Sequence, residues 1–117
     1  MITHTLDLDV VPDKQPKTLW LSQNDENYTL VFNLFARTGE LTIESGTTVA
    51  INGTKPDGTA YTKAATLNGT TVTVVGDADM TSAAGQGVFE LTLTHSGKEL
   101  NTANFFINFE RAARETT

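Results

Sequence analysis

The two histidines of the chain are the first candidates for chemistry, because imidazole often acts as a general base. A hydrolytic triad needs a histidine beside both a serine hydroxyl and a carboxylate. His4 and His95 stand in different parts of the sequence, and nothing in the pattern brings either one together with both partners. His95 directly precedes Ser96, but neighbours in sequence do not have triad geometry. We therefore predict no catalytic residues and interpret both histidines as exposed residues at strand ends.

Carboxylates form two closely spaced pairs, Asp7 with Asp9 and Asp77 with Asp79. Residues i and i+2 of a strand share a face, so the first pair could bind a cation or act as acid and base. We favour the interpretation that it forms the solvent face of an edge strand, where charge also deters edge-to-edge pairing. The second pair lies in a loop and is a better calcium candidate, but it lacks the further acidic ligands of a dedicated site. We predict no metal and no cofactor.

Other common kinds of site need residues that the sequence lacks. There are no cysteines, which excludes a disulfide, a zinc–thiolate cluster and a thiol nucleophile. Gly85-Gln86-Gly87 precedes a strand pattern rather than a helix, so it lacks the helix N-terminus that binds phosphate. These residues give no reason to assign an enzymatic activity.

Net charge and hydropathy limit the classes of partner that we expect the protein to bind. The chain has 8 Lys and Arg against 14 Asp and Glu, a net charge of −6, with no basic stripe of the kind that binds nucleic acid. No apolar run approaches the ~20 residues of a membrane span. The first residues lack the pattern of a signal peptide. We expect a soluble protein that is made in the cytoplasm and binds neither nucleic acid nor membrane.

The elements that must position all these residues are strands, because apolar and polar side chains alternate along most of the chain. The alternation is clearest over residues 6–10, 28–35, 70–75, 88–94 and 103–109, with a brief pair at Leu41 and Ile43. Short strands with frequent turn signals are typical of an antiparallel β-sandwich, here of about 7–9 strands. We predict a single all-β domain over residues 1–110, followed by a polar tail or the start of a linker at 111–117.

Turn chemistry supports this division. Lys55-Pro56-Asp57-Gly58 suits a tight turn, since proline presets φ and glycine accepts a positive φ. Asn68-Gly69 is the strongest short hairpin signal and predicts a return strand from Thr70. Asp77–Gly85 breaks the alternation and is predicted to be a loop with one helical turn.

Three large aromatic side chains fall outside the principal apolar rows. Phe35 and Phe106 face away from the buried side of their strands, and Trp20 lies in a short segment that resembles an edge strand. A sandwich strand needs only one buried face, so such residues indicate a surface that something else covers. Either a partner protein covers them or the chain's own loops do, residues 77–85 included. Trp20, Phe35 and Phe106 are our candidate interface residues.

The order of these turns and strands resembles the N-terminal immunoglobulin-like domain of phage baseplate upper proteins. The resemblance rests on Gly53–Thr59 followed by Asn68-Gly69, on Met80–Gly85 leading into Gly87–Leu93, and on Thr102–Glu110. Together these pieces run in order from about Ile2 to Glu110. The resemblance implies an immunoglobulin-like sandwich that belongs to a virion and transfers no catalytic residues.

The same resemblance implies a place and partners. In that family the N-terminal sandwich attaches the polypeptide to the baseplate core, and the chain continues through helical or fibrous segments toward receptor-binding proteins, commonly in trimers. We therefore expect a tail or baseplate component that contacts other virion proteins and forms a homo-oligomer, with a trimer as the model. Because this sequence stops at Thr117, we expect either the N-terminal piece of a longer protein or a domain used alone. In the second case a capsid decoration or head-fibre role is the alternative.

Two further hypotheses belong to other classes of function. A carbohydrate-binding module at the host surface would need exposed aromatic residues, and only Trp20, Tyr28 and Tyr61 are available, with Tyr28 expected to be buried. A small hydrolase would need the constellation that the sequence does not show. We rank a structural, non-enzymatic virion protein above both.

Overall fold

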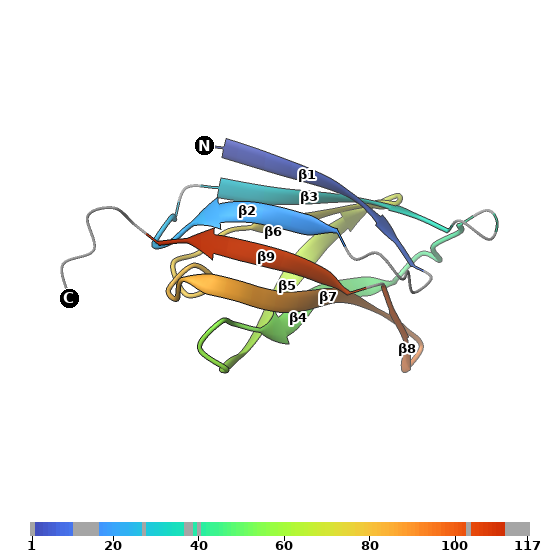
Figure 1. Cartoon of the computed structure of the whole chain (residues 1–117). Coiled ribbons are helices and arrows are strands. Elements are labelled where there is room, and N and C mark those ends of the chain that lie inside the picture. Colours follow the sequence, from blue (N-terminus) through green and yellow to red (C-terminus); the bar gives the residue numbers. More distant parts are fainter. Residues whose placement is uncertain are drawn as a thin grey trace.

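The computed structural model describes residues 2–10, 17–26, 28–36, 39, 41–102 and 104–111. Within these ranges every regular element is a β-strand and none is a helix, which confirms the all-β class. The nine strands in Figure 1 agree with the expected number. Residues 112–117 of the expected tail, residue 103 of the last expected strand and residues 11–16 lie outside the described part.

The strands form one mixed sheet. They are β1 (Ile2–Asp9), β2 (Thr18–Ser22), β3 (Tyr28–Phe35), β4 (Thr48–Thr54), β5 (Ala60–Asn68), β6 (Thr71–Val75), β7 (Gly85–His95), β8 (Lys98–Asn101) and β9 (Phe105–Glu110). Their order is β1-β3-β6-β5-β4-β7-β9-β2, with β8 paired to β7. β1 pairs parallel with β3 and β2 pairs parallel with β9, while the other pairings among the described strands are antiparallel. The expected antiparallel arrangement thus holds inside the sheet and is wrong at its two outer strands.

The parallel pairings arise from a crossover near the beginning of the chain. β2 follows β1 in sequence but lies at the opposite end of the strand order, and β3 then returns to lie beside β1. Parallel strands need a long connection of this kind, whereas antiparallel strands need only a tight turn. Side chains alternate with the same period in both cases, so the sequence pattern did not reveal the direction of these strands.

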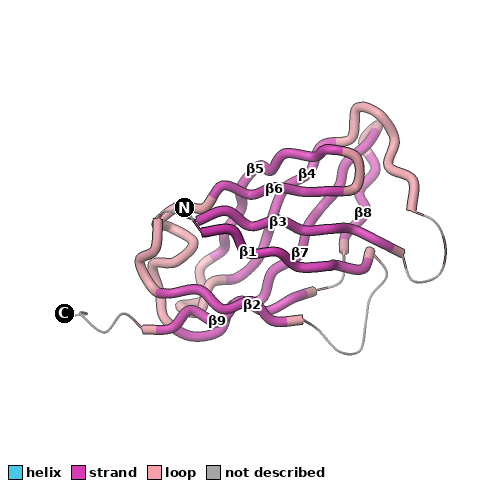
Figure 2. Tube along the Cα trace, turned by 90° about the horizontal axis from the view of Figure 1, so that it is seen from above, coloured by secondary structure: helices cyan, strands magenta, loops and turns pink. Residues whose placement is uncertain are grey.

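The sheet curls until its inner face packs against itself, nearly closing into a barrel (Figure 2). Phe32 of β3 and Phe105 of β9 touch across the interior with ring centroids 5.0 Å apart, although their strands are not neighbours in the sheet. The alternation expected for β3 is confirmed, since Tyr28, Leu30, Phe32 and Leu34 are all buried. One continuous core therefore fills the space inside the curl.

The hairpin between β5 and β6 is shifted by one residue from the expected turn. Asn68 pairs with Thr71, so the two-residue loop is Gly69–Thr70 rather than Asn68–Gly69. Gly69 has a φ of 64°, as the first loop position of a type II′ turn requires, and no Cβ there would meet a neighbour. The predicted hairpin is confirmed, and Gly69 occupies the loop position whose positive φ would strain other residues.

Two loops differ from the expected pattern. Residues 41–44 form no strand, and the side chains of Leu41 and Ile43 pack partly buried against the core. Residues 77–83 form turns and bends instead of the expected helical turn. Both segments cover ends of the core rather than extend the sheet.

β7 is long enough to carry two partners along one edge. Gly85–Phe89 pairs with β9, and Thr92–His95 pairs with β8. At the junction the Thr102 N–H donates to the Leu91 carbonyl at 2.9 Å, and the Leu91 N–H donates to the Thr102 hydroxyl at 3.0 Å. These two bonds keep the backbone of the junction paired and fix the β7–β8 hairpin against the rest of the sheet.

We predict that Gly53→Ala destabilises the protein while Gly39→Ala does not. A Cβ on Gly53 would overlap the Val88 carbonyl and the Phe89 ring, whereas one on Gly39 would meet nothing within 4 Å. Overpacking of this kind lowers the free energy of unfolding by about 1–3 kcal/mol. A substitution at an open surface site changes this free energy by less than about 0.5 kcal/mol. Urea unfolding of both variants measures the difference. Equal midpoints would contradict the close approach of β4 to Phe89.

Candidate functional site

The carboxylate of Asp77 is the centre of a polar cluster beneath the 77–83 loop. It accepts hydrogen bonds from the Tyr61 hydroxyl at 3.0 Å, the Lys63 ammonium at 3.1 Å and the Met80 N–H at 2.9 Å. The Tyr28 hydroxyl donates to the Asp77 backbone carbonyl at 3.1 Å. Burial raises the pKa of both tyrosines, so the two phenols stay protonated and serve as donors. The cluster fastens the loop over one end of the core.

The ionisation of Asp77 is set by two opposing effects. Burial acts to raise the pKa of this carboxyl, but the hydrogen bonds from Met80, Lys63 and Tyr61 outweigh it and hold the pKa below its ordinary value. The carboxylate is thus charged and fully engaged at neutral pH. It is neither a proton donor nor an open ligand.

Asp79, the other half of the expected calcium pair, is also occupied. Its carboxylate binds the ammonium of Lys55 at 2.9 Å. The Lys55 side chain is only 8% exposed, and its ammonium also donates to the Ser82 hydroxyl at 3.3 Å. The hydrogen bond that Lys55 donates to Asp79 is the main reason that the pKa of Lys55 is raised. Among the described residues, no three His, Asp or Glu side chains are grouped closely enough to hold a metal ion. Asp77 and Asp79 therefore fasten a loop to two lysines.

Asp7 and Asp9 do not behave as one pair. Asp7 is exposed and accepts a hydrogen bond from the Asn33 amide at 3.2 Å, but Asp9 is only 4% exposed, so the expected solvent face is wrong for Asp9. The side chain of Lys17 reaches across this end of β1. Its ammonium donates to the Asp7 carbonyl and lies 5.5 Å from the ring centroid of Phe35, the residue opposite Asp9. The two carboxylates therefore lie in different environments and do not form one site.

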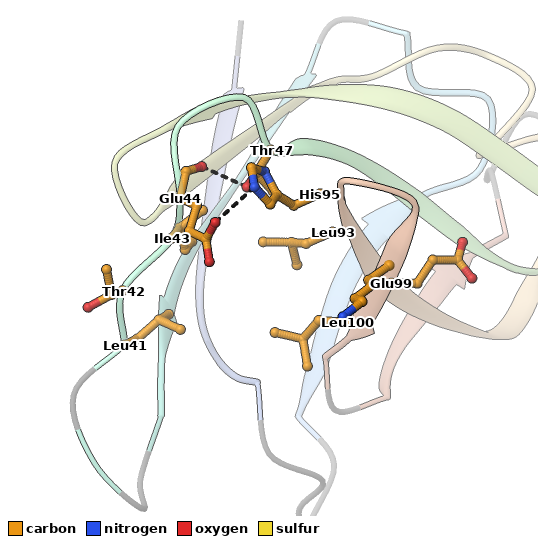
Figure 3. A pocket seen from close by; sticks show the side chains of 10 residues that line it. Leu41, Thr42, Ile43, Glu44, Thr47, Leu93, His95, Glu99 and Leu100 are labelled. Carbon is orange, nitrogen blue, oxygen red and sulfur yellow. Dashed lines mark hydrogen bonds and ion pairs between the residues drawn. The ribbon is translucent and has the colours of Figure 1, made fainter.

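A pocket of about 250 Å³ lies between the 41–47 loop and the β7–β8 hairpin (Figure 3). Its apolar lining comes from Leu41, Ile43, Leu93 and Leu100, and its polar lining from Thr42, Glu44, Thr47, His95, Lys98 and Glu99. The volume is below the ~300–1,000 Å³ of typical small-molecule sites. It is large enough for a single side chain of another protein or for a small molecule.

His95 meets an acid in this pocket, which the sequence did not lead us to expect. Its Nε2 lies 2.8 Å from a carboxylate oxygen of Glu44, and the Thr47 hydroxyl donates to the Glu44 backbone carbonyl at 2.7 Å (Figure 3). The second ring nitrogen of His95, Nδ1, is buried and has no hydrogen-bond partner among the described residues. No hydroxyl of the described residues is bonded to the imidazole, so acid, imidazole and hydroxyl do not form the relay of a triad there. The contact ties the 41–47 loop to the end of β7.

His4 plays no part in that pocket. It lies half-buried in β1, two residues after the strand begins at Ile2. His95 is half-buried as well, so the interpretation of the histidines as exposed is wrong for both, although His95 does stand at the end of β7 as expected.

Two of the three candidate interface residues come together on the outer face of the sheet. Phe106 of β9 lies opposite Val88 of β7 and opposite Thr18 of β2, so Trp20 is its diagonal neighbour. Trp20 is 66% exposed, Val88 is 40% exposed and Phe106 is half-buried. β2, β9 and β7 lie side by side in Figure 1, so Trp20, Phe106 and Val88 form one apolar stripe across them. We call these three residues the apolar stripe.

Phe35 does not belong to the apolar stripe. It lies on β3, in the other half of the curled sheet, and Lys17 stacks over its ring. The chain itself thus covers part of this ring, and 39% of Phe35 stays exposed. Val88 is the member of the stripe that the sequence reasoning missed, although its place opposite to Phe89 in the alternation was a usable signal.

Comparison with known proteins finds similarity at the level of the fold. The chain matches no protein-family model and no curated protein sequence. Among solved structures, the N-terminal domain of phage TP901-1 ORF48 superposes with a TM-score of 0.72 and 13% sequence identity, covering 94% of this chain and 99% of that one. At this identity the match shows a shared fold over nearly the whole length of both domains.

We predict that Asp77→Asn lowers stability at neutral pH and flattens its dependence on acid. The folded carboxyl has a pKa below its ordinary value of 3.8, so its stabilisation is fully present above that pH and is lost as the pH falls through the folded value. Because 36% of the Asp77 side chain is exposed, we expect a loss of about 1 kcal/mol, the size of a typical hydrogen bond. Urea unfolding at neutral pH and below pH 3.8 measures both effects.

The matched control for this prediction is Glu26→Gln, which changes an exposed carboxylate. It is expected to leave the free energy of unfolding at neutral pH within about 0.5 kcal/mol of the wild type. An Asp77→Asn protein as stable as this control would show that the polar cluster does not hold the loop.

Proposed function

We propose that the protein is a non-enzymatic structural component of a bacteriophage particle that acts by docking on neighbouring virion proteins. The observation that carries the proposal is the full-length fold match to the N-terminal domain of phage TP901-1 ORF48. The order of turns and strands, which resembles a phage baseplate domain, supports it independently of the superposition. Both comparisons favour the same kind of particle.

The finer parts of the proposal concern place and assembly. We assign residues 1–110 to a single attachment domain of immunoglobulin-like type at the tail or baseplate, in a homo-oligomer that we take to be a trimer. The domain assignment is supported by the rings of Phe32 and Phe105, which bring an early and a late strand into one core. A particle-bound protein also fits a scaffold whose described polar clusters are engaged within the chain.

The apolar stripe is the surface we assign to docking. Trp20 is 66% exposed and lies diagonal to Phe106, which in turn lies opposite Val88. Tryptophan is among the residues that contribute most to protein interfaces when they become buried. Isolated apolar side chains on a surface need no explanation, but three contiguous ones across adjacent strands do. A protein of the same particle is the occupant that the phage fold match favours.

The sugar-binding alternative loses two of its three aromatic residues. Tyr28 and Tyr61 are 1% and 4% exposed, and their hydroxyls are bonded to Asp77. Only Trp20 remains available to stack on a sugar ring. A single exposed ring is a weaker basis for glycan binding than for a protein contact, where it has apolar neighbours on the same face.

We predict that Trp20→Ala weakens docking by about thirtyfold while leaving the fold intact, since truncation of an interface tryptophan that becomes buried typically costs about 2 kcal/mol. Val75→Ala is the matched control, because Val75 is 57% exposed but lies on β6, away from the stripe. The tagged chain is co-expressed with the structural proteins encoded beside its gene, and the affinity of the purified pair is measured by calorimetry.

The outcomes separate the alternatives. Loss of affinity in Trp20→Ala but not in Val75→Ala, with unchanged unfolding of both, supports docking through the stripe. A wild-type chain that binds none of those proteins contradicts the structural role. If the wild-type chain binds host-surface glycans and Trp20→Ala does not, the sugar-binding function is favoured over the structural role.

We also predict that the purified protein hydrolyses no generic esterase or glycosidase substrate above background, because no nucleophile is bonded to His95 within the described structure. His95→Ala should give the same background as the wild type. Turnover by the wild type that His95→Ala abolishes would contradict the non-enzymatic proposal.

A further inference from the structure

The chain contains an asparagine–glycine step twice in almost the same sequence, at Ile51-Asn52-Gly53-Thr54 and at Leu67-Asn68-Gly69-Thr70. In such a step the asparagine side chain can react with the backbone nitrogen of the glycine that follows it. The glycine backbone nitrogen loses its proton and bonds to the asparagine Cγ, and the side-chain nitrogen leaves as ammonia. Water then opens the resulting five-membered imide at either carbonyl, giving aspartate or isoaspartate. Asparagine is for this reason a chemically labile residue.

The fold prevents this reaction at Asn52. The residue lies half-buried in β4, and its side-chain nitrogen donates to the Thr92 hydroxyl at 2.6 Å. Gly53 is held in the middle of the sheet, paired with Tyr61 on one side and with Phe89 on the other. To form the imide, the Asn52 side chain would have to break its hydrogen bond to Thr92, and the backbone would have to break its pairing within the sheet.

The related step at Asp57-Gly58 is also restrained. The Asp57 carboxylate accepts from the Thr59 N–H at 3.0 Å and from the Thr59 hydroxyl at 2.6 Å. The Gly58 N–H, which would be the nucleophile, donates to the Lys55 carbonyl at 2.9 Å. Both reacting groups are therefore engaged in the turn.

Asn68 is the exception. It is exposed at the last position of β5, and Gly69 stands in open space at the tip of the hairpin with a φ of 64°. Within the part of the chain that the structure describes, neither the Asn68 side chain nor the Gly69 N–H is a partner in a hydrogen bond. Glycine also allows the backbone rotation that ring closure needs.

We propose that Asn68 is a site of spontaneous deamidation and that the fold directs the reaction to this residue and away from Asn52. The product carries one more negative charge at the hairpin tip. Isoaspartate also inserts a methylene into the backbone next to the pair Asn68–Thr71, one of the three register pairs that join β5 to β6. Modification therefore loosens the connection between the two halves of the curled sheet.

The test compares the two asparagines within one molecule. The folded protein is kept for weeks in mildly alkaline buffer, and peptide mapping by mass spectrometry follows the mass gained when an amide becomes a carboxylate. A parallel sample is kept in denaturant. Asn68→Gln, which retains the amide but cannot form the five-membered imide, is the matched control for the appearance of more acidic species.

We expect Asn68 to convert at least about tenfold faster than Asn52 in the folded protein, the factor that corresponds to about 1.4 kcal/mol of restraint. The two rates should become comparable in denaturant, because the local sequences are nearly the same. The acidic species should be absent from Asn68→Gln. An unreacted Asn68, equal rates in the folded protein, or a difference that persists in denaturant would each overturn the proposal.

Discussion

The packing of Phe32 against Phe105, with Phe89 stacked beyond it, holds the two halves of the molecule together. β3 and β9 share no backbone ladder, so contact between their inward side chains is what closes the sheet on itself. Burial of aromatic rings supplies a large non-directional stabilisation, and ring geometry adds to it. The strands other than the fully exposed β8 must then present an apolar row to this interior, which fixes the side of the sheet on which their other side chains lie.

This packing determines which surfaces of the molecule remain for contact with other molecules. The inner face is filled, and the loop over one end is fastened by Asp77 and Asp79 to lysines and tyrosines, so the described polar groups at this end are engaged within the chain. At the other end, the bond between Glu44 and His95 closes one side of a small apolar pocket. The outer face remains, and on it the apolar stripe extends across three adjacent strands. Under the function that we propose, a scaffold of this kind acts by contact rather than by chemistry.

The sequence predicted the elements well because side-chain alternation and turn residues are local properties. The buried row of β3 and the glycine at the tip of the β5–β6 hairpin could both be read directly. The exposed positions of Trp20 and the outward direction of Phe106 also follow from alternation alone.

Other features depend on which strands become neighbours, and a single sequence does not contain that information. The parallel pairing of β1 with β3 comes from a crossover that the alternation of side chains does not reveal. The contact between Glu44 and His95 joins residues on separate elements, and the adjacency of Val88 to Phe106 depends on register. In each case the missing quantity is a distance between segments far apart in the chain.

The most direct test of this account is a cryo-electron microscopy map of the purified phage particle, with the protein identified in it by mass spectrometry. The account predicts density for the curled sheet within the particle, with the Trp20 side of β2, β9 and β7 covered by a neighbouring subunit. A particle that lacks the protein, or one in which that face is open to solvent in every copy, would contradict it.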